Sequence, residues 1–79
     1  MFLIILNLEG LDMYYKRILD LREERFWTQQ YVAKQLNISQ RSYSHYENGT
    51  RNIPIDIVCK LADLYKVSTD YILERTNNI

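Results

Sequence analysis

Apolar residues recur at helical intervals in several short segments, and this spacing restricts the chain to a bundle of short helices. In the first segment Tyr14, Ile18 and Leu21 are separated by four and three residues, which places them on one face of a helix. Only two glycines and one proline interrupt the 79 residues, and no internal repeat occurs. A chain of this length forms a single small core. We therefore predict an all-α fold, a compact bundle of about five short helices.

Polar residues mark where these helices begin and end. Thr28, Ser39 and Ser68 can each accept a hydrogen bond from the first free backbone N–H groups of a following helix. Asn37 tolerates the left-handed conformation that ends a helix, so the turn between the second and third helices is very short. The predicted fourth helix carries a wide apolar stripe: Ile57, Val58, Leu61, Ala62, Leu64 and Tyr65.

The segment from residue 40 to 47 has two chemically different faces. At about 100° per residue, Tyr43, Tyr46 and Glu47 fall on one side. The other side carries hydrogen-bonding groups: Gln40, Arg41, Ser44 and His45. Two helices joined by a turn of three or four residues, the second with polar groups outward, have the geometry of a helix-turn-helix in a DNA major groove. The same pattern fits any helical hairpin in a small bundle.

Residues 28–49, with the sequence TQQYVAKQLNISQRSYSHYENG, resemble the helix-turn-helix of the Cro and lambda-repressor-like family, also called the xenobiotic-response-element type. Residues 53–73 resemble the fourth and fifth helices of that family, and the whole resemblance covers about residues 14–75. Asn37 stands where the family usually has glycine, and Tyr43 replaces a branched aliphatic residue. The resemblance implies a sequence-specific DNA-binding regulator, acting as a repressor by occupying its operator.

The outward face of the third helix has the chemistry that base reading requires. Gln40 can pair with adenine N6 and N7, and Arg41 can pair with guanine O6 and N7. Ser44 and His45 lie one helical turn further on and extend the same strip. The family resemblance points to Gln40, Arg41 and His45 as the principal base readers.

Phosphate contacts are expected on either side of this strip. Gln29 begins the second helix, where free N–H groups and the helix dipole favour an anion. Asn48, Thr50 and Arg51 follow the third helix and can contact the same DNA backbone further along.

Arg22 and Glu47 are both placed inward by the helical period. A buried charge needs a partner, so these two residues are candidates for one ion pair, and the alternative is two independent solvated charges. This pair would tie the first helix to the end of the third, and the family resemblance implies the same pair.

The charge of the central segment predicts weak binding by a single copy. Residues 26–53 contain three basic residues against one acidic residue, a net of plus two. Few phosphates can be neutralised, so we predict a homodimer on an inverted-repeat operator with half-sites about 34 Å apart. The fourth and fifth helices, with Tyr71 and Leu73, and the apolar run Phe2 to Leu6 are the predicted dimer surfaces.

Composition excludes several other classes of protein. The chain is expected to have three parts. Residues 1–12 form an apolar leader or arm, which is too short to span a membrane. Residues 13–75 form the helix-turn-helix domain, and residues 76–79 form a polar tail. The sequence has one cysteine, Cys59, which we expect to be buried, and one histidine. These two residues cannot form a disulfide within the chain, a closed metal site or a pair of catalytic nucleophile and base. We therefore predict a cytoplasmic protein that is not an enzyme. No cofactor or small-molecule ligand is indicated. The alternative function is a protein-interaction module, antitoxin-like or regulator-binding, which neutral total charge favours.

Overall fold

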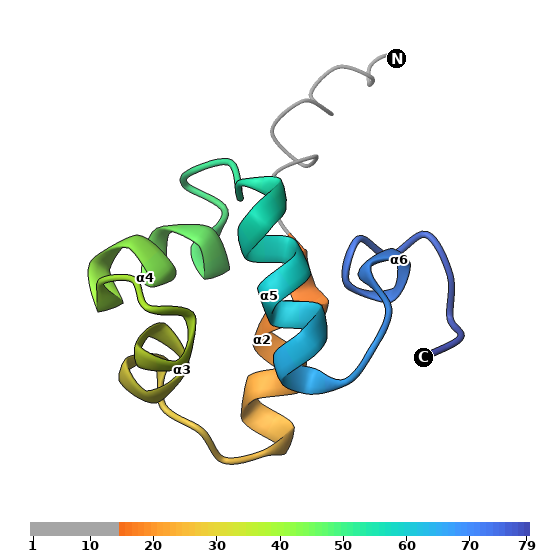
Figure 1. The fold of residues 1–79 in the computed structure, drawn as a ribbon, viewed down its shortest axis with the longest axis horizontal. Coiled ribbons are helices and arrows are strands. Elements are labelled where there is room, and N and C mark those ends of the chain that lie inside the picture. The colour runs from red at the N-terminus through yellow and green to blue at the C-terminus, as the bar shows by residue number, and fades with distance from the viewer. Residues whose placement is uncertain (1–14) are drawn as a thin grey trace, which may run out of the picture.

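The computed structural model describes residues 15–79, and this part of the chain is entirely helical apart from its turns and loops. Its five helices are α2 (Lys16–Glu24), α3 (Gln29–Leu36), α4 (Gln40–Asn48), α5 (Ile55–Tyr65) and α6 (Thr69–Ile72). Figure 1 shows α2 and α5 in the middle of the molecule, with α3 and α4 on one side and α6 on the other. The predicted all-α architecture is confirmed. The predictions for Tyr14 and for the run from Phe2 to Leu6 lie outside the described residues.

Three helices begin at the polar residues that the sequence indicates. The side chain of Thr28 accepts a hydrogen bond from the backbone N–H of Tyr31, and Ser68 accepts one from Tyr71. Ser39 accepts one from Ser42, at 3.0 Å. Each bond satisfies a backbone N–H group that has no partner within its own helix. All three predicted caps are confirmed.

The turn between α3 and α4 is short because Asn37 adopts the left-handed conformation, with φ 61° and ψ 43°. The backbone N–H of Ile38 then donates to the carbonyl of Ala33 at 3.0 Å, which closes the end of α3. Ile38 packs against the core and anchors the turn. The relative orientation of α3 and α4 is therefore set by backbone hydrogen bonds and by packing together.

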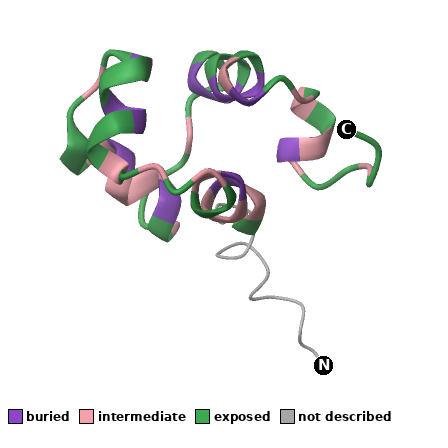
Figure 2. Ribbon diagram, turned by 90° about the horizontal axis from the view of Figure 1, so that it is seen from below, coloured by how far each residue is buried: buried purple, intermediate pink, exposed green. Residues whose placement is uncertain are grey.

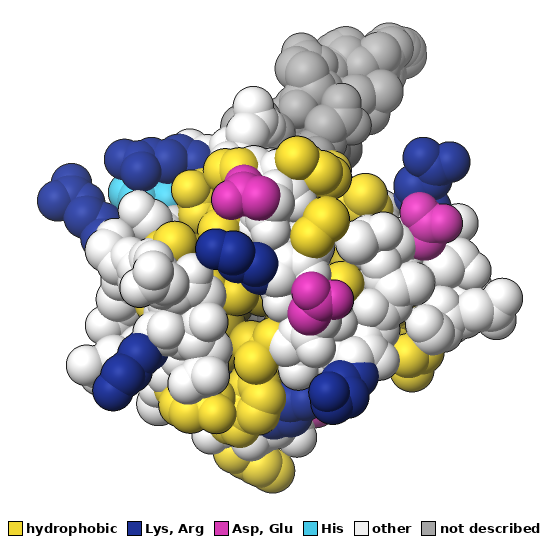
Figure 3. Space-filling model, in the orientation of Figure 1, with side chains coloured by type: hydrophobic (Ala, Val, Ile, Leu, Met, Phe, Trp, Pro, Cys, Tyr) yellow, Lys and Arg dark blue, Asp and Glu magenta, His cyan; other side chains and the backbone are white. Residues whose placement is uncertain are grey.

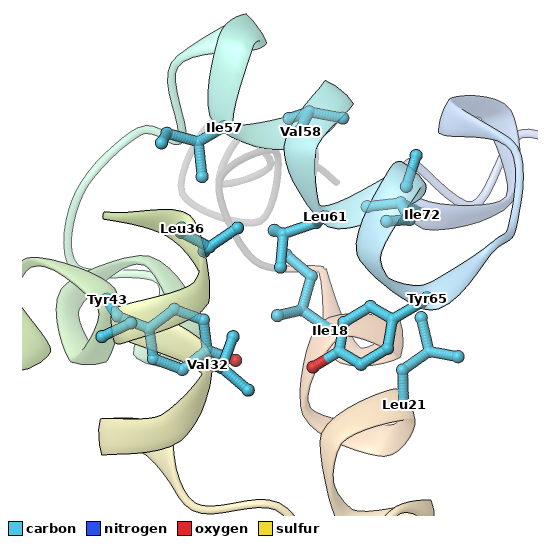
Figure 4. Packing of buried hydrophobic residues seen from close by; sticks show 12 residues of the cluster. Ile18, Leu21, Val32, Leu36, Tyr43, Ile57, Val58, Leu61, Tyr65 and Ile72 are labelled. Atoms are coloured by element: carbon cyan, nitrogen blue, oxygen red, sulfur yellow. The ribbon is translucent and has the colours of Figure 1, made fainter. Parts of the chain in front are cut away.

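One hydrophobic core lies between the helices. Figure 2 shows buried residues where the helices face one another and exposed residues on their outer surfaces. The predicted stripe of α5 is largely correct, since five of its six residues are buried and Leu64 is half-buried. Figure 4 shows that all five helices contribute side chains to the core. The largest fully buried side chains of the core are Tyr43, Tyr65, Ile18, Leu36, Leu61, Ile72 and Val32.

The prediction that Cys59 is buried is wrong, because Cys59 is exposed. The buried positions of α5 run from Ile57 to Tyr65. At about 100° per residue, Cys59 lies roughly 130° around the helix from the centre of that stripe. The apolar character of the cysteine side chain misled the prediction, whereas its helical phase places it outside.

The last residues fold back against α2 instead of extending away as a separate tail. Arg17 of α2 donates hydrogen bonds to the carbonyls of Tyr71, at 2.9 Å, and of Thr76, and to the side-chain oxygen of Asn77 at 2.6 Å. Its guanidinium also lies 4.2 Å from the centre of the Tyr71 ring, within cation–π range. This arginine therefore ties the segment after α6 to the bundle.

Candidate nucleic-acid interface

A groove runs along the outer side of α4, between the start of α3 and the loop after α4. Its lining residues are Gln29, Gln40, Arg41, Ser44, His45, Asn48 and Thr50. These are seven of the eight residues that the sequence predicts to contact DNA. The eighth, Arg51, is exposed and is next to Thr50 in the chain.

The groove lies on a side of the molecule where basic side chains gather. Gln40 and Arg41 are exposed at the start of α4, whereas Ser44 and His45 are half-buried. Figure 3 shows several lysine and arginine side chains and the histidine over the α4 side, while the acidic side chains visible in that view lie toward α5 and α6. The single acidic residue of α3 and α4 is Glu47, and it is buried. A negatively charged ligand is therefore not repelled here.

Beneath the groove, Glu47 is the centre of a buried hydrogen-bond network. Arg22 donates to both carboxylate oxygens, from Nε at 2.8 Å and from Nη2 at 2.9 Å. Tyr43 donates to Oε2 at 2.6 Å, and Gln29 donates to Oε1 at 2.9 Å. The structure thus contains the ion pair expected between Arg22 and Glu47, and it joins α2, α3 and α4 at one carboxylate.

These contacts shift the pKa values of the network in opposite directions. Burial disfavours the charged carboxylate of Glu47, but the hydrogen bonds from Arg22, Tyr43 and Gln29 outweigh it and hold the pKa below its ordinary value. The hydrogen bond to Glu47 raises the pKa of Arg22 against the opposing effect of burial. For Tyr43, burial and then the hydrogen bond to Glu47 raise the pKa. Glu47 and Arg22 are therefore both charged near neutral pH.

Tyr43, the unusual residue on the inward face of α4, owes its place to this carboxylate. Its side chain is fully buried, and its hydroxyl group has Glu47 as a partner. A buried hydroxyl without a partner would be costly. Tyr43 therefore fills the core as an aliphatic residue would and also adds a bond to the network.

The network positions Gln29 at the edge of the groove. Gln29 is the first residue of α3, and one hydrogen of its side-chain amide is used by Glu47. The second amide hydrogen and the free backbone N–H groups of the first turn can still donate to an anion. Sequence reasoning did not foresee this support for Gln29, because the contact joins residues 18 positions apart whose pairing depends on how α3 and α4 cross.

Two further contacts order side chains along α4. The amide of Asn48 donates to the hydroxyl oxygen of Ser44 at 3.3 Å. The hydroxyl oxygen of Thr50 lies 2.7 Å from His45 Nδ1. Thr50 also donates its backbone N–H to the carbonyl of His45 at 2.9 Å. A phosphate contact from either donor of Thr50, as the sequence suggests, would require one of its bonds to His45 to break.

Neither a metal-binding cluster nor a membrane-spanning helix is found among the described residues. Among residues 15–79 no group of three or more histidine, cysteine, aspartate or glutamate side chains is placed to hold a metal ion. No helix in the same range is long and apolar enough to cross a membrane.

A short two-helix unit, a polar second helix on the surface and a basic surrounding surface together define a helix-turn-helix domain. Comparison with known families agrees, since the family model described as helix-turn-helix matches residues 18–72. The chain belongs to this family, the Cro and lambda-repressor-like type.

Several regulators of transcription are similar to this chain. The HTH-type transcriptional regulator ImmR of Bacillus subtilis is 41% identical over 58 residues, 73% of this chain and 46% of ImmR. The HTH-type transcriptional regulator AnsR of the same species is 35% identical over 63 residues, 80% of this chain and 54% of AnsR. The cryptic phage CTXphi transcriptional repressor RstR of Vibrio cholerae is 38% identical over 55 residues, 70% of this chain and 50% of RstR. The chain thus spans about half the length of these curated relatives. No solved structure gives a significant match.

Proposed function

We propose that this protein is a sequence-specific double-stranded DNA-binding regulator of transcription that places α4 in the major groove and represses by occupying its operator. The observation that carries the proposal is the groove along α4, which is lined by seven of the eight residues proposed to read bases or bind phosphates. The relatives ImmR and AnsR are regulators of transcription, which supports the same role here, and RstR is a transcriptional repressor, which supports repression. Residues 13–75 would form the DNA-binding unit.

The chemistry of the groove supports a division between base reading and backbone contact. Gln40, Arg41, Ser44 and His45 are the proposed base readers, since paired donors and acceptors on a helix distinguish base edges in the major groove. The proposed phosphate contacts flank them: Gln29, Asn48, Thr50 and Arg51. Thr50 would serve mainly through its position beside His45, because its donors are already used.

We also propose that the protein binds as a homodimer on an inverted repeat. The support is the small net positive charge of residues 26–53, which limits the affinity of one copy. Ile55 of α5 is 68% exposed and, with half-buried Tyr71 and Leu73, offers apolar surface for a contact between copies. A molar mass that stays monomeric by light scattering at every concentration, with and without operator, would exclude this dimer.

A protein-interaction module is the second candidate, because the ten basic and ten acidic residues of the sequence cancel. The two functions separate in one pair of variants. Substituting Gln40 and Arg41 by alanine should abolish operator binding in a regulator. The same substitutions on the groove should leave binding to a protein partner intact if that partner docks elsewhere.

The test of the proposed function is selection from a random duplex library followed by sequencing of the enriched pool. We expect an enriched inverted repeat for the wild-type protein and loss of that enrichment for Arg41→Ala. Weak binding without any enriched sequence would contradict base reading and would favour the interaction module.

A further inference from the structure

We infer that Thr50 is a positioning residue that fixes the imidazole of His45 so that its unprotonated Nε2 faces the groove, which makes His45 a hydrogen-bond acceptor for a base donor. The part of this inference that concerns base recognition rests on the proposed function. The part that concerns the tautomer of His45 rests only on contacts within the chain. Adenine N6 and cytosine N4 are the donors in the major groove that such an acceptor would recognise.

The turn that ends α4 brings Thr50 back to His45. Gly49 follows the helix with φ 79°, a left-handed conformation that suits glycine. The chain therefore turns back, and the backbone N–H of Thr50 reaches the carbonyl of His45 at 2.9 Å while that of Gly49 reaches Tyr46 at 3.3 Å. This pair of bonds is the Schellman arrangement of a helix C-terminus. It holds the side chain of Thr50 against the side chain of His45 before any ligand is present.

The hydroxyl of Thr50 has a single proton to donate. The oxygen of Thr50 lies 2.7 Å from His45 Nδ1 and 3.2 Å from the His45 carbonyl oxygen. A carbonyl oxygen can only accept, and this one has a second lone pair beside the bond from the Thr50 backbone N–H, so the single hydroxyl proton is donated to it. The hydroxyl oxygen then accepts from Nδ1–H, and Nε2 of the neutral ring carries no proton.

The fixed ring of His45 presents one nitrogen to a ligand in the groove. Both His45 and Thr50 line the groove, so the ring edge that is not bonded to Thr50 is the edge available to a ligand there. A ring already fixed in one orientation and one tautomer loses less freedom on binding than a free ring. Thr50 thus contributes to base preference without touching a base itself.

The test compares wild type with Thr50→Val, which removes the hydroxyl and keeps the branched shape, and with Thr50→Ser, which keeps the hydroxyl. His45 is the only histidine in the sequence, so its ring signals need no assignment. Long-range ¹H–¹⁵N spectra at pH 8, above the usual titration range of histidine, report which nitrogen carries the proton. We expect a dominant Nδ1–H form in wild type and in Thr50→Ser, and a mixture in Thr50→Val.

The DNA half of the test repeats the library selection with each variant. We expect Thr50→Val to lose preference roughly tenfold at one base position while the rest of the repeat is retained, and Thr50→Ser to behave as wild type. An Nε2–H form in wild type, or unchanged spectra and unchanged preference in Thr50→Val, would overturn the inference. If wild type enriches no sequence, the proposed function fails, and the spectra still decide the tautomer. Circular dichroism checks that each variant is folded.

Discussion

Substituting glutamine for Glu47 tests the buried network that joins α2, α3 and α4. Glu47 and Arg22 have side chains only 4% and 14% exposed, and the carboxylate accepts four hydrogen bonds. Glu47→Gln keeps the shape but removes the negative charge, which leaves Arg22 as a buried cation without a counter-charge. Removing one partner of a buried ion pair costs about 3–5 kcal/mol. We take the lower figure, about 3 kcal/mol, because glutamine retains one acceptor oxygen.

A loss of that size is large for a domain this small. With a midpoint shift of about 4–8 °C per kcal/mol, the thermal midpoint should fall by roughly 12–24 °C. Urea unfolding followed by circular dichroism measures the free energy directly. The matched control is Asp20→Asn, which breaks the exposed pair between Lys16 and Asp20. Exposed pairs of this kind contribute about 0.5 kcal/mol or less.

The pH dependence gives the same experiment a second readout. The pKa of Glu47 is lower in the folded protein than its ordinary value, so its stabilisation is present above about pH 4.5, the value for an unperturbed glutamate. That stabilisation is lost as the pH falls through the folded pKa. The stability difference between wild type and Glu47→Gln should therefore shrink below about pH 4.5. A difference under 0.5 kcal/mol at pH 7, equal to that of Asp20→Asn, would refute the reasoning.

Four further substitutions test single residues. The hydroxyl of Tyr65 is buried without a hydrogen-bond partner among the described residues, so Tyr65→Phe should raise stability by about 1 kcal/mol. Tyr43→Phe should lower it by a similar amount, because that hydroxyl donates to Glu47, and urea unfolding of both variants checks the opposite signs. Burial raises the pKa of Tyr65 to about 12, so the unfolded state loses this proton first and stability falls between about pH 10 and 12. Tyr65→Phe should make that fall smaller in alkaline unfolding, and part of it should remain because burial also raises the pKa of Tyr43. Phe26 has φ 58°, a conformation that favours glycine, and its side chain is 94% exposed. Phe26→Gly should therefore raise the free energy of unfolding by about 1 kcal/mol. A lower free energy of unfolding would show that contacts of the ring stabilise the fold. Arg17→Ala should release the segment after α6, because Arg17 holds that segment by hydrogen bonds. The amide of Ser68, which donates to the carbonyl of Ile79, should then exchange its hydrogen faster. Unchanged exchange at Ser68 would contradict this role of Arg17.

Much of this fold could be predicted because its signals are local. A cap such as Ser39 acts on a backbone group three residues away, and Asn37 sets its own backbone conformation. Helical phase alone brought Arg22 and Glu47 to the inside, where each needed a partner. The grouping of the polar side chains along α4 follows from the same phase.

The features that were missed depend on geometry that a pattern does not contain. Phe26 occupies the left-handed position after α2, where glycine is the expected residue, and no local signal marks it. The support of Gln29 by Glu47 requires the crossing of α3 and α4. The contact between Thr50 and His45 requires the turn at Gly49, because a straight continuation of α4 would carry Thr50 away.

A single titration can show whether the groove along α4 reads DNA sequence. The affinities of wild type, Arg41→Ala and Arg75→Ala are measured for the selected duplex and for a duplex with scrambled half-sites, at several salt concentrations. Arg75 has the same charge but follows α6, on the opposite side of the bundle from α4 (Figure 1). We predict that Arg41→Ala weakens binding to the selected duplex by roughly 5- to 150-fold, corresponding to about 1–3 kcal/mol, and that Arg75→Ala has little effect. Equal affinity of wild type for both duplexes, or equal losses in both variants, would contradict base reading by this groove.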